Sequence, residues 1–192
     1  MRVYKLEEIK GLSEEEQKKF LERAYDLGFA YERDYHGCSQ ACLGALQELF
    51  GMTTSEDKAV FKASSGFAGG FGASGEGTCG ALDGGCAFLS YLYGRERDKI
   101  QDPENMRFIA YGTCRRLMDK FRMEYGSWVC KDIQKIRFGK GWYKIYMPEE
   151  FMNVVNMGGH TTLAPITVGN AARWVAEIIL EKETGKVSFG FK

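Results

Sequence analysis

The stretch Gly75-Glu-Gly-Thr-Cys-Gly-Ala-Leu-Asp-Gly-Gly-Cys86 joins a glycine-crowded segment to a helix whose first turn carries a cysteine. Six glycines fall within residues 66–77, and so many glycines do not sustain a helix. Glycine allows positive φ angles and close approach of another group to the backbone. The stretch therefore predicts a glycine-rich loop that leads into a central helix, with Cys79 at its start.

Helical periodicity extends outward from this stretch in both directions. Ser13 and Glu16 form a capping box before one apolar pattern, and Pro103 suits the first position of a later helix. Helices are predicted at about 13–34, 38–50, 54–64, 78–95, 102–126, 128–138 and 165–183. We expect an all-α fold, a compact multi-helix bundle in a single domain over 1–192, with its core at about 13–138, an irregular segment at 139–161 and a C-terminal helix.

The composition narrows the class of protein. Of the 192 residues 44% are hydrophobic, and 26 Lys and Arg are balanced by 26 Asp and Glu. Zero net charge argues against a generic binder of nucleic acid or of a membrane surface. No signal peptide and no run of about 18 apolar residues is visible, so we expect a cytoplasmic chain outside the membrane. In the cytosol, cysteines are more often thiols, metal ligands or catalytic groups than structural bridges.

Charge and aromatic content raise questions about partners. Residues 1–57 carry a net charge of −5 and residues 115–144 a net charge of +6. These are either two solvated faces of one domain or a docking surface for an acidic partner, such as a redox partner protein. Aromatic residues make up 14% of the chain, and the segment 142–158 is rich in Gly, Met and aromatics. An exposed patch of that kind often marks an interface, so we expect a homodimer.

The cysteine at the helix start is the best candidate for chemistry. Unpaired N–H groups and the positive end of the helix dipole favour the thiolate of Cys79. Cys38 and Cys42 lie one turn apart, so one can be functional while the other packs. Cys86 lies about 10 Å along the helix from Cys79, too far for a direct bridge, and is interpreted as a core residue. Cys114 is followed by Arg115 and Arg116, and Cys130 is followed by Lys131. These cations would lower the pKa of a thiol only where the side chains point the same way.

Several standard cofactor motifs are missing from the sequence. There is no C-x-x-C for a zinc ribbon or ferredoxin loop, and no C-x-x-C-H, so no haem is expected. Residues 70–75 match G-x-G-x-x-G, but no strand precedes them, so no NAD is expected. The glycines of this region, Gly75, Gly77 and Gly80, are candidates for packing against a cofactor or binding an anion at the helix start.

A metal site in this chain would depend on sulfur. His36 and His160 are the only histidines, and His160 is interpreted as a hydrogen-bonding loop residue. The ligands would be mainly thiolates from separate helices, a set that selects iron–sulfur clusters, zinc or copper(I).

The assembled motifs resemble the C_GCAxxG_C_C family of redox-active proteins. Cys38 lies in Cys-Ser-Gln-Ala and Cys79 in Cys-Gly-Ala-Leu-Asp-Gly, and two later cysteines match the remainder. The resemblance spans about 36–130 and resumes at 168–177. This family is similar to split-Soret cytochromes, in which a comparable helical domain carries an iron–sulfur centre beside haem.

The resemblance implies an iron–sulfur cluster with Cys38, Cys79, Cys114 and Cys130 as ligands. Some relatives carry a further cysteine directly before the proline of the last helix, where this chain reads Leu163-Ala-Pro165. A ligand set that uses that position would be incomplete here.

Three hypotheses for function follow. The first is a cytoplasmic redox protein whose family cysteines bind an iron–sulfur cluster for one-electron transfer. The second is a thiol–disulfide oxidoreductase in which Cys79 attacks and another cysteine, first of all Cys38, resolves. The third is a non-catalytic zinc-binding or helical adaptor module. No acid–base pair or nucleophile triad stands out, so no turnover reaction is assigned.

Overall fold

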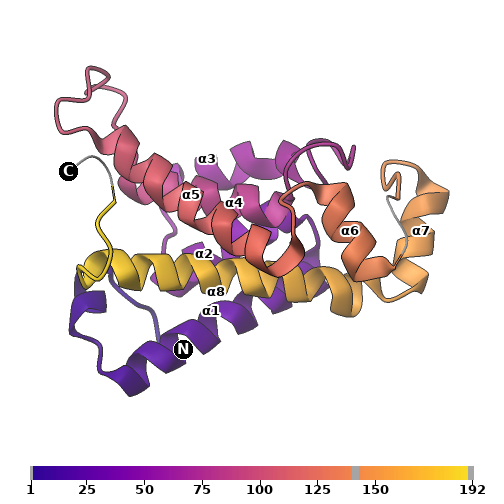
Figure 1. Ribbon diagram of the computed structural model, residues 1–192, viewed down its shortest axis with the longest axis horizontal. Helices are drawn as coiled ribbons and strands as arrows, with labels where there is room; N and C mark the ends of the chain where they lie inside the picture. Colours follow the sequence, from indigo (N-terminus) through magenta and orange to yellow (C-terminus); the bar gives the residue numbers. More distant parts are fainter. Residues whose placement is uncertain (1, 140–142, 190–192) are drawn as a thin grey trace.

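The computed structural model describes residues 2–139 and 143–189. In this part of the chain the fold is all-α as expected, and the only β-type pairing in it is an isolated bridge between Thr78 and Val129 (Figure 1). The elements are η1 (Leu6–Gly11), α1 (Glu14–Tyr35), α2 (Cys38–Phe50), α3 (Ser55–Ala63), η2 (Ser64–Phe67), α4 (Gly80–Tyr93), α5 (Met106–Tyr125), α6 (Cys130–Phe138), α7 (Pro148–Asn156), η3 (Gly159–Leu163) and α8 (Ala164–Glu183).

Helices α1 and α8 lie side by side along much of the molecule (Figure 1). Small residues let the two backbones approach closely. A Cβ at Gly28 would lie 2.8 Å from the carbonyl oxygen of Val168 and 2.9 Å from the Cβ of Ala172. Gly169 faces the ring of Tyr25 in the same way, so any larger side chain at these two glycines would force the helices apart.

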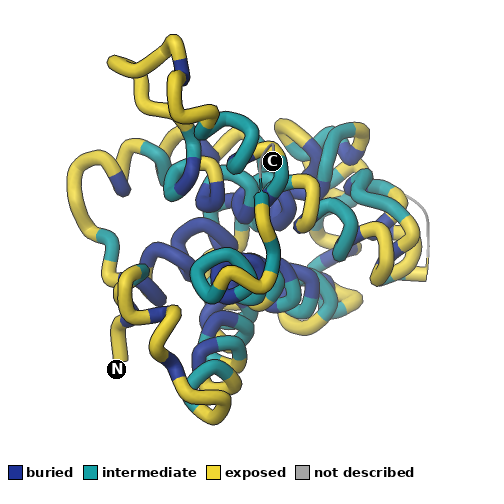
Figure 2. Tube along the Cα trace, turned by 60° about the vertical axis from the view of Figure 1, so that its left-hand side comes forward, coloured by how far each residue is buried: buried dark blue, intermediate teal, exposed yellow. Residues whose placement is uncertain are grey.

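Helices α2, α4 and α8 pass through the interior, as the dark segments of Figure 2 show. Their side chains join those of α1 and α5 in one contiguous apolar cluster. The largest fully buried side chains include Phe20, Phe88, Phe121, Leu43, Leu46, Leu82, Leu89, Leu117, Ile178 and Ile179. This core holds the helix ends described below in fixed positions.

Helix starts agree with the sequence prediction except at α5. Ser13 and Glu16 make the predicted capping box of α1. Helix α5 begins at Met106, four residues after the predicted start at Asp102. The buried Asp102 carboxylate instead accepts hydrogen bonds from the backbone N–H groups of Met106 (2.7 Å) and Arg107 (3.2 Å). Asp102 therefore caps the helix rather than beginning it.

The prediction of an irregular segment at 139–161 is wrong for most of its length. Residues 148–156 form α7, which begins with Pro148 and carries Glu149 and Glu150 in its first turn, a favourable arrangement for a helix start. A π-helical turn, η3, follows and runs directly into α8. The short, mixed composition of this segment hid both elements, and residues 140–142 lie outside the described part.

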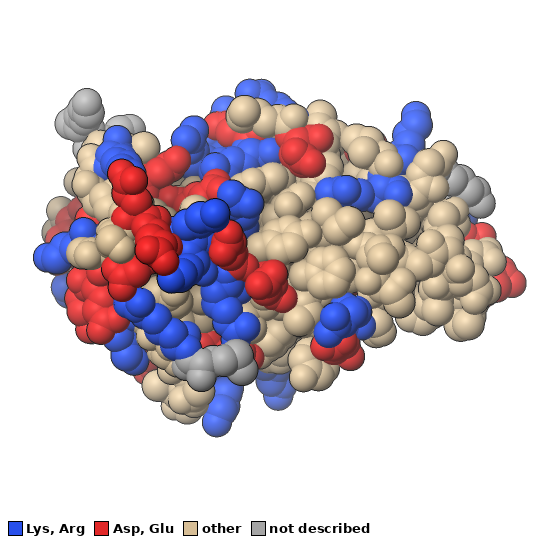
Figure 3. Space-filling view, turned by 90° about the horizontal axis from the view of Figure 1, so that it is seen from below, with Lys and Arg blue, Asp and Glu red and all other residues tan. Residues whose placement is uncertain are grey.

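Apolar side chains remain exposed near α7. Tyr146, Met152 and Met157 have exposed fractions of 57%, 49% and 39%. The end of the molecule that carries α7 also shows few charged side chains in Figure 3, whereas charges of both signs crowd the opposite end. The homodimer stays a prediction that light scattering can test.

The basic segment 115–144 is partly neutralised by ion pairs. Arg116 pairs with Glu181 (3.0 Å) and Lys120 with Glu177 (2.7 Å), both from α5 to α8. Lys131 pairs with Glu76 at 2.6 Å. These ion pairs favour the interpretation of two solvated faces, whose charges are partly paired within the molecule, over a basic docking surface for an acidic partner.

One helix has the length and composition of a membrane span. It is the continuous stretch Gly159–Glu183, and 61% of its most apolar window is buried inside the molecule. The core helix of a globular protein meets the same criterion, so the stretch is weak support for a membrane location.

Candidate functional site

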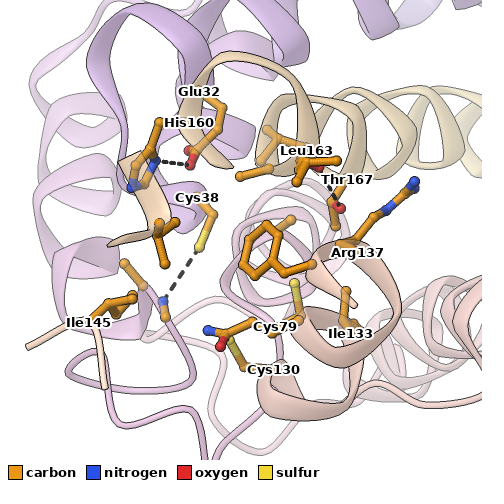
Figure 4. A pocket seen from close by; sticks show the side chains of 18 of the residues that line it. Glu32, Cys38, Cys79, Cys130, Ile133, Arg137, Ile145, His160, Leu163 and Thr167 are labelled. Carbon is orange, nitrogen blue, oxygen red and sulfur yellow. Dashed lines mark hydrogen bonds and ion pairs between the residues drawn. The ribbon is translucent and has the colours of Figure 1, made fainter. Parts of the chain in front are cut away.

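Three helices begin at one cavity, and each begins with a cysteine. Cys38 is the first residue of α2, Cys79 is the N-cap of α4 and Cys130 is the first residue of α6. All three side chains line the cavity (Figure 4). Because the positive ends of three helix dipoles meet there, the cavity is suited to a group of negative charge.

The cavity has a volume of about 120 Å³ and a mainly apolar wall. A single water needs only ~10–15 Å³, so the cavity has room for a polyatomic group. Its wall also contains the following side chains from α6, α7, η3 and α8: Ile133, Gln134, Arg137, Phe138, Val154, His160, Leu163, Ala164, Thr167 and Val168. The cavity therefore lies where the N-terminal half of the chain meets its last helices.

Two glycines of α4 explain how Cys38 reaches the cavity beside Cys79. A Cβ at Gly80 would overlap the sulfur of Cys38, and a Cβ at Gly84 would overlap the backbone oxygen of Ser39. Gly80 and Gly84 are one turn apart, so they form a groove on α4 that receives the first turn of α2. The spacing Cys-Gly-Ala-x-x-Gly is thus a packing requirement for bringing two sulfurs to one place.

The glycine-rich loop fixes the third cysteine. The carbonyl oxygens of Gly77 and Gly75 accept hydrogen bonds from the first N–H groups of α6, those of Cys130 and Lys131, both at 2.9 Å. Gly70 has a φ of 76°, and a Cβ there would lie 2.8 Å from the Cβ of Cys130. The glycines expected to bind a cofactor thus have visible roles in packing and capping: Gly75 and Gly77 hold α6, and Gly80 contacts the sulfur of Cys38.

Each of the three sulfurs is close enough to another to influence its ionisation. Burial raises the pKa of Cys38 well above its usual range, and the charges of Glu32 and Cys79 raise it further. Burial also raises the pKa of Cys79, with a contribution from Cys130, and that of Cys130 to about 12, with a contribution from Cys38. Without a bound cation these groups are neutral thiols at pH 7.

The expectation of an activated Cys79 thiolate is therefore not met in the folded chain. Hydrogen bonds from the N–H groups of Ala81 and Leu82 do lower the pKa of Cys79, as expected at a helix start. Burial outweighs them, because Cys79 is only 6% exposed. A metal cation would supply the charge that the helix start alone does not.

Hydrogen bonds reach the other two sulfurs from the surrounding chain. The N–H of Gly69 lies 3.4 Å from the Cys38 sulfur, and the Gln134 amide nitrogen donates to the Cys130 sulfur at 3.6 Å. Donors of this kind stabilise negative charge on a thiolate.

Three residues that line the same cavity have buried side-chain atoms without a hydrogen-bond partner in the part that the structure describes, although the Arg137 guanidinium points away from the cavity and donates to the Tyr125 hydroxyl at 2.8 Å (Figure 4). Within residues 2–139 and 143–189, Glu32 Oε2, Arg137 Nε and both ring nitrogens of His160 are buried and make no hydrogen bond. His160 Nδ1 lies 3.6 Å from Glu32 Oε1, and its ring contacts the ring of His36 at a centroid distance of 4.5 Å with the two planes tilted by 54°. Buried groups of this kind normally have a partner. The interpretation of His160 as a hydrogen-bonding loop residue is not what the structure shows.

The side chains that could ligate a metal are spread around the cavity and do not converge on the position of a single ion. In the described part of the chain, no three His, Cys, Asp or Glu side chains converge closely enough to hold a single metal ion. The three thiols and the unpartnered polar groups instead lie on different walls of the same space (Figure 4). This donor set fits a polyatomic, thiolate-ligated group better than one ion.

The other three cysteines do not line this cavity. Cys114, expected from the resemblance to be a ligand, lies on α5 against α4, where its sulfur is 3.6 Å from the carbonyl oxygen of Cys86. Cys42 is fully buried in the core one turn beyond Cys38. Cys86 is half-buried beside Cys114 rather than enclosed in the core as interpreted.

Residues 36–178 match a family model with the description "Putative redox-active protein (C_GCAxxG_C_C)". The chain belongs to this family. A search of curated proteins gave no match, and neither did a search of solved structures.

The residues matched by the C_GCAxxG_C_C family model include all three cysteines at the cavity. They also include η3 and the start of α8, which form part of the cavity wall. Ala164, directly before the proline of the last helix, lies in the cavity wall. In this chain that part of the wall has no sulfur.

Sequence reasoning on this C_GCAxxG_C_C protein did not single out Glu32 or Arg137, and it did not place His160 at the site. Arg137 is seven residues after Cys130, two turns along one face of α6, so helical spacing could have indicated it. Glu32 lies in the last turn of α1, directly before α2, and precedes the matched residues. His160 reaches the cavity through the π-helical turn, for which the sequence offers no signal.

Proposed function

We propose that this protein is a redox protein that binds an iron–sulfur cluster through Cys38, Cys79 and Cys130. The observation that carries the proposal is that three cysteines, each at a helix start, line one cavity. Membership of a family described as redox-active agrees with it. Thiolates are the ligands that iron–sulfur clusters take from proteins.

A cluster held there would accept and return one electron. The three helix starts and the N–H group of Gly69 stabilise negative charge on the sulfurs and on anything they bind. The apolar wall of Ile133, Phe138 and Val154 excludes water from the site. Low water access and hydrogen bonds to sulfur are the means by which a protein sets a reduction potential.

Three cysteine thiolates leave one coordination position of a four-ligand cluster without a cysteine ligand. Glu32 and His160 are the non-sulfur donors in the wall, and both have atoms without hydrogen-bond partners among the described residues. We include His160 in the proposed ligand set as the donor of the fourth position. Cys114 is not included, because it does not line the cavity.

The test is metal and sulfide analysis of the full chain purified without oxygen. We expect brown protein with iron and acid-labile sulfide in stoichiometric amounts, and visible absorption that bleaches on reduction. Colourless, iron-free protein from an anaerobic preparation with intact thiols would overturn the proposal.

The same preparation separates the other two functions. Stoichiometric zinc without sulfide would support a zinc-binding module. Reversible loss of two thiols from Cys38 and Cys79, with no metal bound, would support the thiol–disulfide oxidoreductase. The raised pKa values of both thiols count against that second function, because the thiolate is the attacking species.

A further inference from the structure

A second pair of thiols lies outside the cavity, on the contact between α4 and α5. The Cys114 thiol donates a hydrogen bond to the carbonyl oxygen of Cys86, with its sulfur 3.6 Å from that oxygen, and the two thiols are close enough to shift each other's pKa. Gly85, the residue before Cys86, allows this approach, because a Cβ there would lie 2.7 Å from Leu117 on α5. The two sulfurs are thus side by side on neighbouring helices.

The two thiols have different environments. The hydrogen bond from Cys86, with smaller contributions from Ser90 and Thr113, lowers the pKa of Cys114 to about 7. The Ser90 hydroxyl lies 3.6 Å from the Cys114 sulfur. The pKa of Cys86 is raised well above its usual range by the same hydrogen bond and by burial. This asymmetry is typical of an attacking and a resolving cysteine.

The neighbouring arginines do not cause this asymmetry. Arg116 pairs with Glu181 on α8, and Arg115 lies 3.8 Å from Asp119 one turn along its own helix. The lowered pKa of Cys114 therefore comes from the neighbouring thiol rather than from the adjacent cations, whose effect the sequence left open. Both cysteines are half-buried, in contrast to the fully buried Cys42.

We propose that Cys86 and Cys114 form a two-electron redox site that cycles between dithiol and disulfide and is distinct from the cavity. The oxidant is a small-molecule disulfide. The Cys114 thiolate attacks one of its sulfurs, the other sulfur leaves as a thiolate, and a mixed disulfide forms on Cys114. Cys86 then gives its proton to solvent and attacks the Cys114 sulfur, which releases the second small-molecule thiolate. The protein loses two electrons and two protons, and the small disulfide becomes two thiols.

The experiment treats the reduced full chain with glutathione disulfide, alkylates the remaining thiols and maps the products by mass spectrometry. We expect the wild-type protein to lose two alkylatable thiols and to yield a peptide containing Cys86 linked to a peptide containing Cys114. No glutathione adduct should remain. An unlinked pair, or an adduct that persists on Cys114 while Cys86 is free, would overturn the proposal.

Matched variants separate the two roles. Cys86→Ser should retain a stable glutathione adduct on Cys114, whereas Cys114→Ser should give neither an adduct on Cys86 nor a link. Cys42→Ser is the control and should form the same link as the wild-type protein. A link between Cys86 and Cys42 would contradict the assignment. Because the wild-type link needs no variant and no iron, the result is independent of variant folding and of the proposed cluster.

Discussion

The sulfur of Cys38 occupies the space that a side chain on Gly80 would need. The start of α2 and the start of α4 are therefore in direct contact, and the contact exists because position 80 has no Cβ. The relationship connects a feature of the sequence, glycine directly after Cys79, to the convergence of two sulfurs on one cavity.

Gly84→Ala should destabilise the fold. The added methyl group would meet the backbone oxygen of Ser39, which cannot move without a shift of α2. Overpacking of this kind costs about 1–3 kcal/mol in the free energy of unfolding. Urea unfolding measures the loss, and Gly66→Ala is the matched control. Gly66 has no neighbour within 4 Å of an added Cβ, so that variant should unfold at an unchanged or higher urea concentration.

Gly80→Ala should act on the site more than on stability. Its added methyl group would overlap the Cys38 sulfur, which can turn away, and would lie 3.1 Å from the Cα of Ala68 and 3.2 Å from the carbonyl oxygen of Phe67, contacts that a shift of a few tenths of an ångström relieves. We expect the iron content of anaerobically purified protein to fall severalfold, while the urea midpoint moves less than for Gly84→Ala. Equal loss of stability in the two variants, with iron content unchanged, would contradict this account.

Thiol alkylation should depend on pH in a way that identifies Cys114. Because the Cys114 thiol has a pKa of about 7, the fraction of it that is thiolate rises about tenfold between pH 6 and pH 8. The rate at which iodoacetamide modifies Cys114 should rise with it. Cys79 in the metal-free folded chain should stay unmodified throughout, because burial raises its pKa. Faster modification of Cys79 than of Cys114 at pH 7 would reverse the assignment.

Glu32→Gln should not lower the stability of metal-free protein. One carboxylate oxygen of this buried residue makes no hydrogen bond within the described chain, and an amide carries no net charge to bury. Urea unfolding should show an unchanged or increased free energy of unfolding. Glu48→Gln is the contrasting variant, because it removes the charge that pairs with Arg23 at 3.3 Å and weakens the hydrogen bond accepted from Tyr31 at 2.8 Å, so it should lose some stability. A clear loss for Glu32→Gln would mean that its carboxylate is paired.

Much of the architecture could be predicted from local sequence signals. The capping box at Ser13 and the glycines after α2 and α5 mark helix ends through backbone conformation alone. The glycine-rich loop before Cys79 was predicted for the same reason. Such signals act over a few residues, so one chain is enough to detect them.

The site itself was harder to predict, because it depends on contacts between distant segments. Which cysteines share a cavity is decided by the packing of α2 and α6 against α4, and helical spacing along one helix does not contain that information. The ionisation of Cys79 was misjudged because burial, a tertiary property, outweighs the local effect of the helix start. The direction of Arg115 and Arg116, which the sequence left open, is likewise decided by tertiary and helical contacts, since both pair with acidic side chains.

The central claim is that three sulfurs from three helix starts hold one cluster, and iron analysis of single Cys→Ser variants tests it most directly. Cys38→Ser, Cys79→Ser and Cys130→Ser, purified without oxygen, should each lose most of the bound iron and sulfide. Cys114→Ser should keep the wild-type amount. Iron retained in all three cavity variants, or lost only in Cys114→Ser, would contradict the account.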